Sequence, residues 1–435
     1  MSDKKPNVIV FFTDQQRWDT TGVHGNPLEL TPNFDRIALN GTHCFNAFTC
    51  QPVCAPARAA LQTGKYATTA GIERNGRTLG TQKTLAHYFK EGGYTTGYIG
   101  KWHLASRDPV PQDEQGGYDF WLGANVLEAT SDTYRTVVYD KNEKKIFLPG
   151  YRTDAQTDAS IRYVSEQNEQ PYFLFLSYLE PHHQNHVDDY PPPDGYRERY
   201  TGRWTPGDLA AMGGSSAYHL GGYYGMVKRV DEALGRLMDA LKSLGQLDNT
   251  IILFTTDHGN HFKTRNSEYK RSCHEASIRI PMALCGPCFN EGGRITELVS
   301  LVDMPPTLLD AAGLPIPKEM EGRSILDGRK NWPDDIFVQI SESQVGRAVR
   351  TKRWKYGVTA GPDIGERDAL VYTEQYLYDL EYDPHEQVNL IGYASHREVS
   401  KDMQKRLLRY IKEVEGASPA IVNAEETPSE QRIAN

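Results

Sequence analysis

Polar residues whose side chains could bind a metal follow three apolar, β-rich runs of the sequence. The three pairs of run and polar cluster are Asn7–Thr13 with Asp14-Gln15, Tyr172–Tyr178 with Glu180-Pro181-His182-His183, and Thr250–Thr256 with Asp257-His258. Ligands of an open α/β sheet bind outside the carboxyl ends of its strands. We therefore expect the three clusters to converge on one site.

Two carboxylates, one amide and one imidazole make a donor set that consists mostly of oxygen. This set favours Ca²⁺, Mg²⁺ or Mn²⁺ over Zn²⁺. The predicted ligands are Asp14, Gln15, Asp257 and His258. For any one aspartate, capping of the following helix is an equally good interpretation.

A second group of reactive residues lies in Cys54-Ala55-Pro56-Ala57-Arg58, which Ala59–Lys65 follows. This segment resembles the defining C-x-P-x-R element of the sulfatase family, the formylglycine-dependent type I enzymes of the alkaline phosphatase superfamily. In that family a maturation enzyme reads the segment and converts the cysteine to formylglycine. Position 57 falls at the variable position of the signature.

Further segments resemble sulfatase elements in the expected order along nearly the whole chain. They are Gly100-Lys101-Trp102-His103, Pro181-His182, Thr256-Asp257-His258-Gly259, Lys270 ahead of His274-Glu275, and Leu377–Leu380 with Asp383–Leu390. The resemblance implies an alkaline-phosphatase-like α/β fold. It also implies hydrolysis of a sulfate monoester.

The resemblance assigns a role to each of these residues. An aldehyde hydrate at position 54 has two hydroxyls, of which one attacks sulfur and the second later expels sulfate. The cation, Ca²⁺ before Mg²⁺ or Mn²⁺, would be held by Asp14, Gln15, Asp257, His258 and the modified Cys54. Lys101 and Lys270 would bind the sulfate oxygens. Arg58 would hold the diol, His103 would assist its deprotonation, and His182 or Lys270 would protonate the leaving alcohol.

Two features leave alternatives open. The pairs Asp14-Gln15 and Asp257-His258 also occur in formylglycine-dependent phosphonate monoester hydrolases, so a phosphonate or phosphate ester remains the alternative substrate. Cys285-Gly286-Pro287-Cys288 is either a turn after a strand or a thioredoxin-type redox motif, and we favour the turn. His274 either touches substrate or packs.

Elements that position these residues are indicated by periodicity. Helical spacing occurs in Thr31–Asn40, Thr81–Glu91 and Tyr218–Leu244, between the β-rich runs, which predicts βα units around a parallel sheet. The resemblance to sulfatases implies that the large sheet is mixed and flanked by helices. The Pro- and Gly-rich stretch Asp188–Gly214 predicts a long irregular excursion. Its aromatic residues and those after it are expected to rim the pocket and to favour a sugar: Tyr190, Tyr196, Tyr200, Trp204, Tyr218, Tyr223 and Tyr224.

The alternation of β-rich runs and helical segments ends after Pro333. Short antiparallel strands are expected at Ile336–Ser341, Ala348–Arg350 and Trp354–Val358, followed by a helix over Arg397–Glu415. This predicts a catalytic domain of residues 1–331 and a smaller α+β domain of residues 332–435.

The composition of the chain restricts which binding partners and which cellular location we expect. The 435 residues carry a net charge of −9 without a long basic run, which argues against nucleic acid or an anionic membrane as the main partner. The first apolar run, Val8–Phe12, is too short for a signal or membrane-spanning segment, and the six sparse cysteines suit reduced thiols. We therefore expect a cytoplasmic enzyme whose partners are a sulfated small molecule or saccharide and the maturation enzyme.

Overall fold

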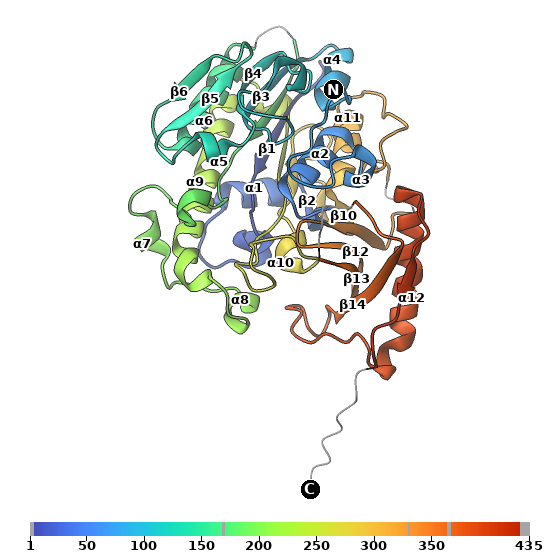
Figure 1. Ribbon diagram of the computed structural model, residues 1–435. Helices are drawn as coiled ribbons and strands as arrows, with labels where there is room; N and C mark the ends of the chain where they lie inside the picture. The colour runs from blue at the N-terminus through green and yellow to red at the C-terminus, as the bar shows by residue number, and fades with distance from the viewer. Residues whose placement is uncertain (1–3, 168–169, 329–330, 363–366, 427–435) are drawn as a thin grey trace.

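Two sheets of different size organise the chain, and helices cover both (Figure 1). The computed structural model describes residues 4–167, 170–328, 331–362 and 367–426. No helix within these ranges is both long enough and apolar enough to cross a bilayer.

The large sheet is mixed, as the resemblance to sulfatases implies, and not wholly parallel as the βα pattern predicts. Its ten strands, in spatial order within the described ranges, are β10 (Gly293–Ser300), β2 (Thr42–Phe48), β9 (Ala283–Cys285), β8 (Thr250–Thr256), β1 (Asn7–Thr13), β7 (Tyr172–Ser177), β3 (Thr95–Lys101), β4 (Phe120–Ala124), β5 (Thr136–Asp140) and β6 (Lys145–Leu148). The five strands from β8 to β4 are parallel, whereas β9 and the β5–β6 edge are antiparallel. The carboxyl ends of β1, β7, β8 and β3 therefore meet at one edge.

Every residue of β1 is buried, because helices pack on both faces of the sheet. Val8, Val10 and Phe12 share a core with α2 (Cys54–Thr63), α4 (Leu85–Glu91) and α11 (Met304–Ala311). Ile9 and Phe11 face the opposite core, which contains α1 (Pro32–Asn40), α6 (Arg152–Ser165) and α9 (Ser216–Ser243). The short helices are α3 (Ala67–Ala70), α5 (Leu127–Thr130) and α10 (Glu275–Ile278).

Most predicted elements lie where periodicity indicates. The runs Asn7–Thr13 and Thr250–Thr256 are strands over their full length. The helix expected from Thr81 begins only at Leu85, because Thr84 is its N-cap: its backbone N–H donates to Nδ1 of His87.

The interpretation of Asp188–Gly214 as irregular is wrong in part. This stretch contains α7 (Tyr196–Tyr200) and α8 (Gly207–Ala211), and α7 packs on α9. All of the aromatic residues expected at the pocket rim except Tyr218 instead belong to a separate core with Phe262 and Leu209. Tyr190 and Tyr223 are fully buried, so neither can stack on a sugar, and Tyr218 alone of the predicted set is strongly exposed.

The smaller sheet has the order β11 (Asp335–Ile340), β12 (Gln344–Thr351), β13 (Trp354–Pro362), β14 (Val371–Asp379), β15 (Ala420–Val422). The strands from β11 to β14 are antiparallel, as expected, but β15 pairs in parallel with β14. The α-helix α12 (Arg397–Tyr410) lies along this sheet (Figure 1) and continues as one wider turn to Glu415.

The two parts share a core: Cys50, Ala60 and Val302 pack with Phe337 and Val349 beneath the small sheet. A buried ion cluster also links them, because Nζ of Lys355 lies 2.7 Å from Oε1 of Glu275 and 2.6 Å from Oε1 of Glu386. The domain boundary near Asn331 stays a prediction.

Candidate active site

Helix α2 presents Cys54 as its first residue, beside the carboxyl ends of the central strands. All residues of this helix are buried, and its alanines allow close packing against the sheet. The helix ends where Gly64 adopts a left-handed conformation with φ of 71°. Position 54 thus lies at the positive end of the helix dipole, which favours negative charge there.

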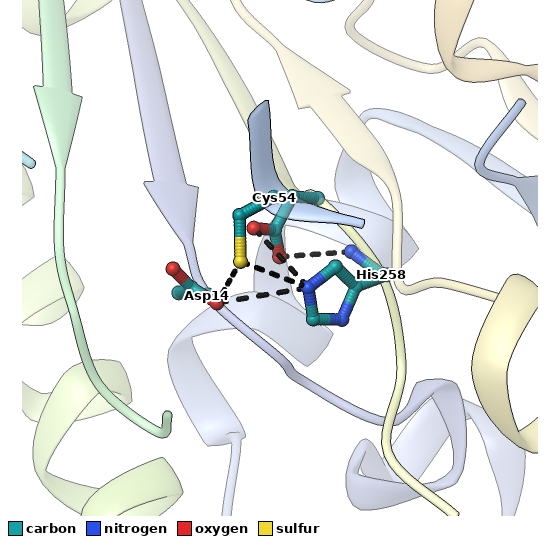
Figure 2. Close-up of side chains that lie close together, drawn as sticks. Asp14, Cys54 and His258 are labelled. Atoms are coloured by element: carbon teal, nitrogen blue, oxygen red, sulfur yellow. Dashed lines mark hydrogen bonds and ion pairs between the residues drawn. The ribbon is translucent and has the colours of Figure 1, made fainter. Parts of the chain in front are cut away.

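Figure 2 shows the Cys54 side chain pointing toward Asp14 and His258. The Sγ atom lies 3.8 Å from Oδ1 of Asp14 and 3.3 Å from Nε2 of His258, and Nζ of Lys270 donates to it at 2.8 Å. Burial opposes ionisation of the thiol, but Lys270 and Lys101 hold the pKa of Cys54 well below its ordinary value. The surroundings of residue 54 are therefore built to stabilise an anion.

Asp14 is held through one of its two oxygens. Its Oδ2 accepts from Nη2 of Arg58 at 2.9 Å and from Nζ of Lys101 at 2.8 Å, while its Oδ1 faces Cys54 and His258. Burial alone would raise the pKa of Asp14, yet Lys101, His182 and Arg58 bring it below its usual range. Asp14 is therefore ionised, with Oδ1 directed at the Cys54 thiol and His258.

The two carboxylate oxygens of Asp257 also differ in their contacts. Its Oδ1 accepts the backbone N–H groups of Gln15 at 3.0 Å and His258 at 2.9 Å. Its Oδ2 is buried and lacks a hydrogen-bond partner within the described part of the chain. Burial and the neighbouring charge of Asp14 raise the pKa of Asp257 to about 7. Two buried carboxylates this close need compensating positive charge. Arg58 supplies part of it, with its Nε 3.7 Å from Oδ2 of Asp257.

His258 and Gln15 complete the donor set. Nδ1 of His258 lies 2.9 Å from the carbonyl of Gly259, which makes Nδ1 the donor and leaves the lone pair on Nε2. The Oε1 of Gln15 is buried without a hydrogen-bond partner among the described residues.

One ligand atom from each of Asp14, Cys54, Asp257 and His258 lies within 4.8 Å of the others. The donors present, including the two orphaned oxygens of Gln15 and Asp257, fit a hard divalent cation.

Lys101 ends strand β3 and is fully buried. Its Nζ contacts Oδ2 of Asp14 and Oε1 of Glu128, both at 2.8 Å. Burial disfavours the ammonium, but these two carboxylates raise the pKa of Lys101 above its ordinary value. The backbone carbonyl of Lys101 accepts from Nη1 of Arg58 and from Oγ of Ser177, each at 2.8 Å. Arg58 thus ties the Cys54 helix to two strand ends.

Lys270 lies between Cys54 and His182, with Nζ in contact with both side chains. Nδ1 of His182 lies 2.6 Å from the carbonyl of His183, and its Nε2 lies 3.5 Å from Nζ of Lys270. A hydrogen bond from His103 also lowers the pKa of Cys54, while Nδ1 of His103 has no hydrogen-bond partner among the described residues. The structure therefore brings the residues predicted from the sequence to one place.

Other reactive side chains lie elsewhere. His274 is buried against Tyr376 and Tyr378, which agrees with a packing role. Cys285 pairs with Ile252 on β8, toward the edge opposite the candidate site, and neither Cys285 nor Cys288 forms a disulfide. The turn interpretation of that motif fits this placement.

Sequence reasoning missed two residues and misplaced a third. Glu128 lies in the short helix α5 and carried no motif signal, although it contacts Lys101. Asn260 follows the Asp257-His258 pair by two residues and donates to the hydroxyl of Tyr190. Tyr190 was expected at the rim but lies behind Gln15, whose Nε2 donates to the same hydroxyl.

Comparison with protein families identifies the family of the chain. The model of the sulfatase family matches residues 6–314, and a second model, N-sulphoglucosamine sulphohydrolase C-terminal, matches residues 267–413. The chain belongs to the sulfatase family. It is thus a sulfuric ester hydrolase with an alkaline-phosphatase-like fold.

Relatives of this sulfatase match over nearly all of its length. The ulvan-active sulfatase of Formosa agariphila is 28% identical, over 94% of this chain and 82% of its own. The N-acetylglucosamine-6-O-sulfatase of Bacteroides thetaiotaomicron is 26% identical, over 93% of this chain and 86% of its own.

Solved structures show the same fold. The sulfatase resembles the putative sulfatase yidJ of Bacteroides fragilis with a TM-score of 0.83 and 24% identity, covering 95% of this chain and 97% of that one. The phosphonate monoester hydrolase of Agrobacterium radiobacter gives 0.73 and 23%, covering 94% and 96%. The fold alone therefore does not separate sulfur from phosphorus chemistry.

Proposed function

We propose that this sulfatase hydrolyses sulfate monoesters of carbohydrates, using formylglycine made from Cys54 and one divalent cation, Ca²⁺ before Mg²⁺ or Mn²⁺. The observation that carries the proposal is the position of Cys54 at the start of a buried helix, with Lys270, His258 and Asp14 around its Sγ atom. A maturation enzyme that oxidises Cys54 is the protein partner this requires.

The cation would be held by Asp14, Gln15, Asp257, His258 and residue 54, and it would supply charge neutralisation at a sulfate oxygen and a lower pKa for a bound hydroxyl. Formylglycine would supply the nucleophilic hydroxyl and a second hydroxyl for sulfate release. Oε1 of Gln15 and Oδ2 of Asp257, which have no hydrogen-bond partner among the described residues, belong to this set of ligands.

The charged residues of the chain do the remaining work. Lys101 and Lys270 bind the other sulfate oxygens, where negative charge increases in the transition state. Arg58 holds Asp14 and, through the Lys101 carbonyl, the end of β3. Nδ1 of His182 donates to a carbonyl, so a second proton on Nε2 would be the one delivered to the leaving alcohol; Lys270, 3.5 Å away, is the alternative acid.

A carbohydrate substrate is supported by two relatives whose names specify an ulvan activity and a 6-O-sulfated N-acetylglucosamine. The aromatic rim expected from the sequence lends no support, because Tyr190 and Tyr223 are buried. Hydrolysis of a phosphonate or phosphate ester is the alternative activity.

Mass spectrometry of the peptide containing Cys54 tests the chemistry first. Maturation is expected to lower the peptide mass by about 18 Da relative to the thiol. A matured sample is then assayed on sulfated mono- and disaccharides beside aryl sulfate, phosphate and phosphonate esters. Faster hydrolysis of the phosphonate by orders of magnitude would contradict the proposal, as would turnover by a protein whose Cys54 is unmodified.

A further inference from the structure

The hydroxyl of Tyr190 lies directly behind the Gln15 side chain. Tyr190 is fully buried, and its oxygen accepts from Nε2 of Gln15 at 3.2 Å and from Nδ2 of Asn260 at 2.9 Å. Asn260 is itself fixed, because its Oδ1 accepts the backbone N–H of Phe262 at 2.9 Å. The amide of Asn260 therefore presents its NH₂ group to Tyr190 and holds the phenol oxygen in place.

In the structure this contact engages the Nε2 branch of the Gln15 amide. The Nε2 and Oε1 atoms share one carbon, so engaging Nε2 leaves Oε1 on the other branch, buried and without a hydrogen-bond partner in the described residues. Rotating the amide by half a turn would exchange the two atoms. An NH₂ group cannot bind a cation, whereas an amide oxygen can.

We propose that Tyr190 is a positioning residue for the cation site: its hydroxyl, held by Asn260, engages Nε2 of Gln15 and so keeps Oε1 available as a ligand. The inference rests on the proposed cation, but it assigns a role to a residue that touches neither cation nor substrate. Partners behind a metal ligand affect affinity because they fix the orientation of that ligand.

Calcium binding to the full-length, metal-stripped protein, measured by titration calorimetry with CaCl₂, tests this role without using turnover. Tyr190→Phe retains the buried ring and removes only the hydroxyl. We expect it to raise the Kd for Ca²⁺ by about tenfold.

Tyr224→Phe is the matched control. Tyr224 is also buried, and its hydroxyl has no hydrogen-bond partner within the described ranges, so its loss should leave the Kd unchanged. Melting temperatures of both variants establish that each is folded.

Repeating the comparison in a Gln15→Glu protein separates an effect on the orientation of residue 15 from an effect on packing. In Gln15→Glu both terminal atoms are oxygens, so a half-turn of the side chain no longer matters. In that background, the increase in the Kd for Ca²⁺ caused by Tyr190→Phe is therefore expected to be only about twofold or less. A purely structural effect of Tyr190 would persist there undiminished.

The outcomes separate the two proposals. If the unsubstituted protein binds none of Ca²⁺, Mg²⁺ and Mn²⁺, the cation itself is refuted, and the role of Tyr190 falls with it. If that protein binds Ca²⁺ and Tyr190→Phe binds it equally well, or loses as much affinity in the Gln15→Glu background, only the role of Tyr190 is refuted. Should Tyr190→Phe fail to fold, Asn260→Ser removes the donor that holds the phenol and is subject to the same comparison.

Discussion

Glu128 offers the sharpest test of how the candidate site is held together. Its Oε1 lies 2.8 Å from Nζ of Lys101, both side chains are buried, and its Oε2 has no hydrogen-bond partner in the described part of the chain. Glu128→Gln keeps the size of the side chain but removes its charge. Lys101 then retains only Asp14 as an ionised partner.

The expected change in the free energy of unfolding follows from the pKa of Glu128. Burial opposes ionisation, but Lys101, His182 and His103 lower this pKa from 4.5 to about 2. Each pKa unit corresponds to about 1.4 kcal/mol, so the folded protein favours ionised Glu128 by about 3 kcal/mol. A carboxyl group whose pKa is lowered on folding stabilises the protein above its unfolded pKa, and this stabilisation is lost as the pH falls through the folded pKa.

Urea denaturation of the protein and of Glu128→Gln measures the difference in the free energy of unfolding. We expect Glu128→Gln to be less stable by about 3 kcal/mol, by the same amount from about pH 6 to pH 8, with the difference shrinking below about pH 4.5. With Lys101 less firmly held, kcat is expected to fall by about tenfold, equivalent to about 1.4 kcal/mol of transition-state stabilisation.

The control is Glu91→Gln, which removes an exposed partner of Lys83. It should change stability by less than about 0.5 kcal/mol. Equal stability of Glu128→Gln and the unsubstituted protein, together with an unchanged kcat, would refute the view that Glu128 positions Lys101.

Three other outcomes are expected. Chelation should abolish sulfate ester hydrolysis, and Ca²⁺, Mg²⁺ or Mn²⁺ should restore it better than Zn²⁺; full turnover by the stripped, matured enzyme would contradict the cation site. Cys54→Ser should attack the substrate once and retain the sulfuryl group, seen as a gain of about 80 Da in intact mass, whereas multiple turnover at the unsubstituted rate would show that residue 54 is not the nucleophile. Lys355→Met should lower the free energy of unfolding in urea by about 3–5 kcal/mol, because Glu275 and Glu386 lose their shared buried cation. Lys401→Met, at an exposed pair, should have almost no effect, and equal losses would refute the importance of the buried cluster.

The fold and the strand-end residues were predictable because local pattern and chemistry coincide there. Continuous apolar runs such as Thr250–Thr256 indicate a strand covered on both faces, and parallel strands place their carboxyl ends at one edge. Once β1 and β8 are adjacent, Asp14 and Asp257 must approach each other. The sequence thus predicts the shared edge, and the observed pairing of β1 with β8 makes the two aspartates neighbours.

The supporting residues were not predictable, because their roles depend on long-range packing. Glu128 meets Lys101 only because α5 follows β4, which pairs with β3. Tyr190 carries no sign of burial in its Pro-rich surroundings, and short helices turn this segment back onto α9. Aromatic content predicts contact area, but it does not indicate whether that area faces solvent or a core.

Charge balance determines which substitutions can report on this site. The carboxylates of Asp14, Asp257 and Glu128 face the cations of Arg58, Lys101 and Lys270 in a region almost closed to solvent. Deleting one buried charge leaves its partner uncompensated, which destabilises the fold whatever the deleted group does in the reaction. An inactive Asp14→Ala protein would therefore not identify a metal ligand. Substitutions that retain buried volume, paired with a control of equal burial and measured for both stability and Ca²⁺ affinity, can separate the two effects.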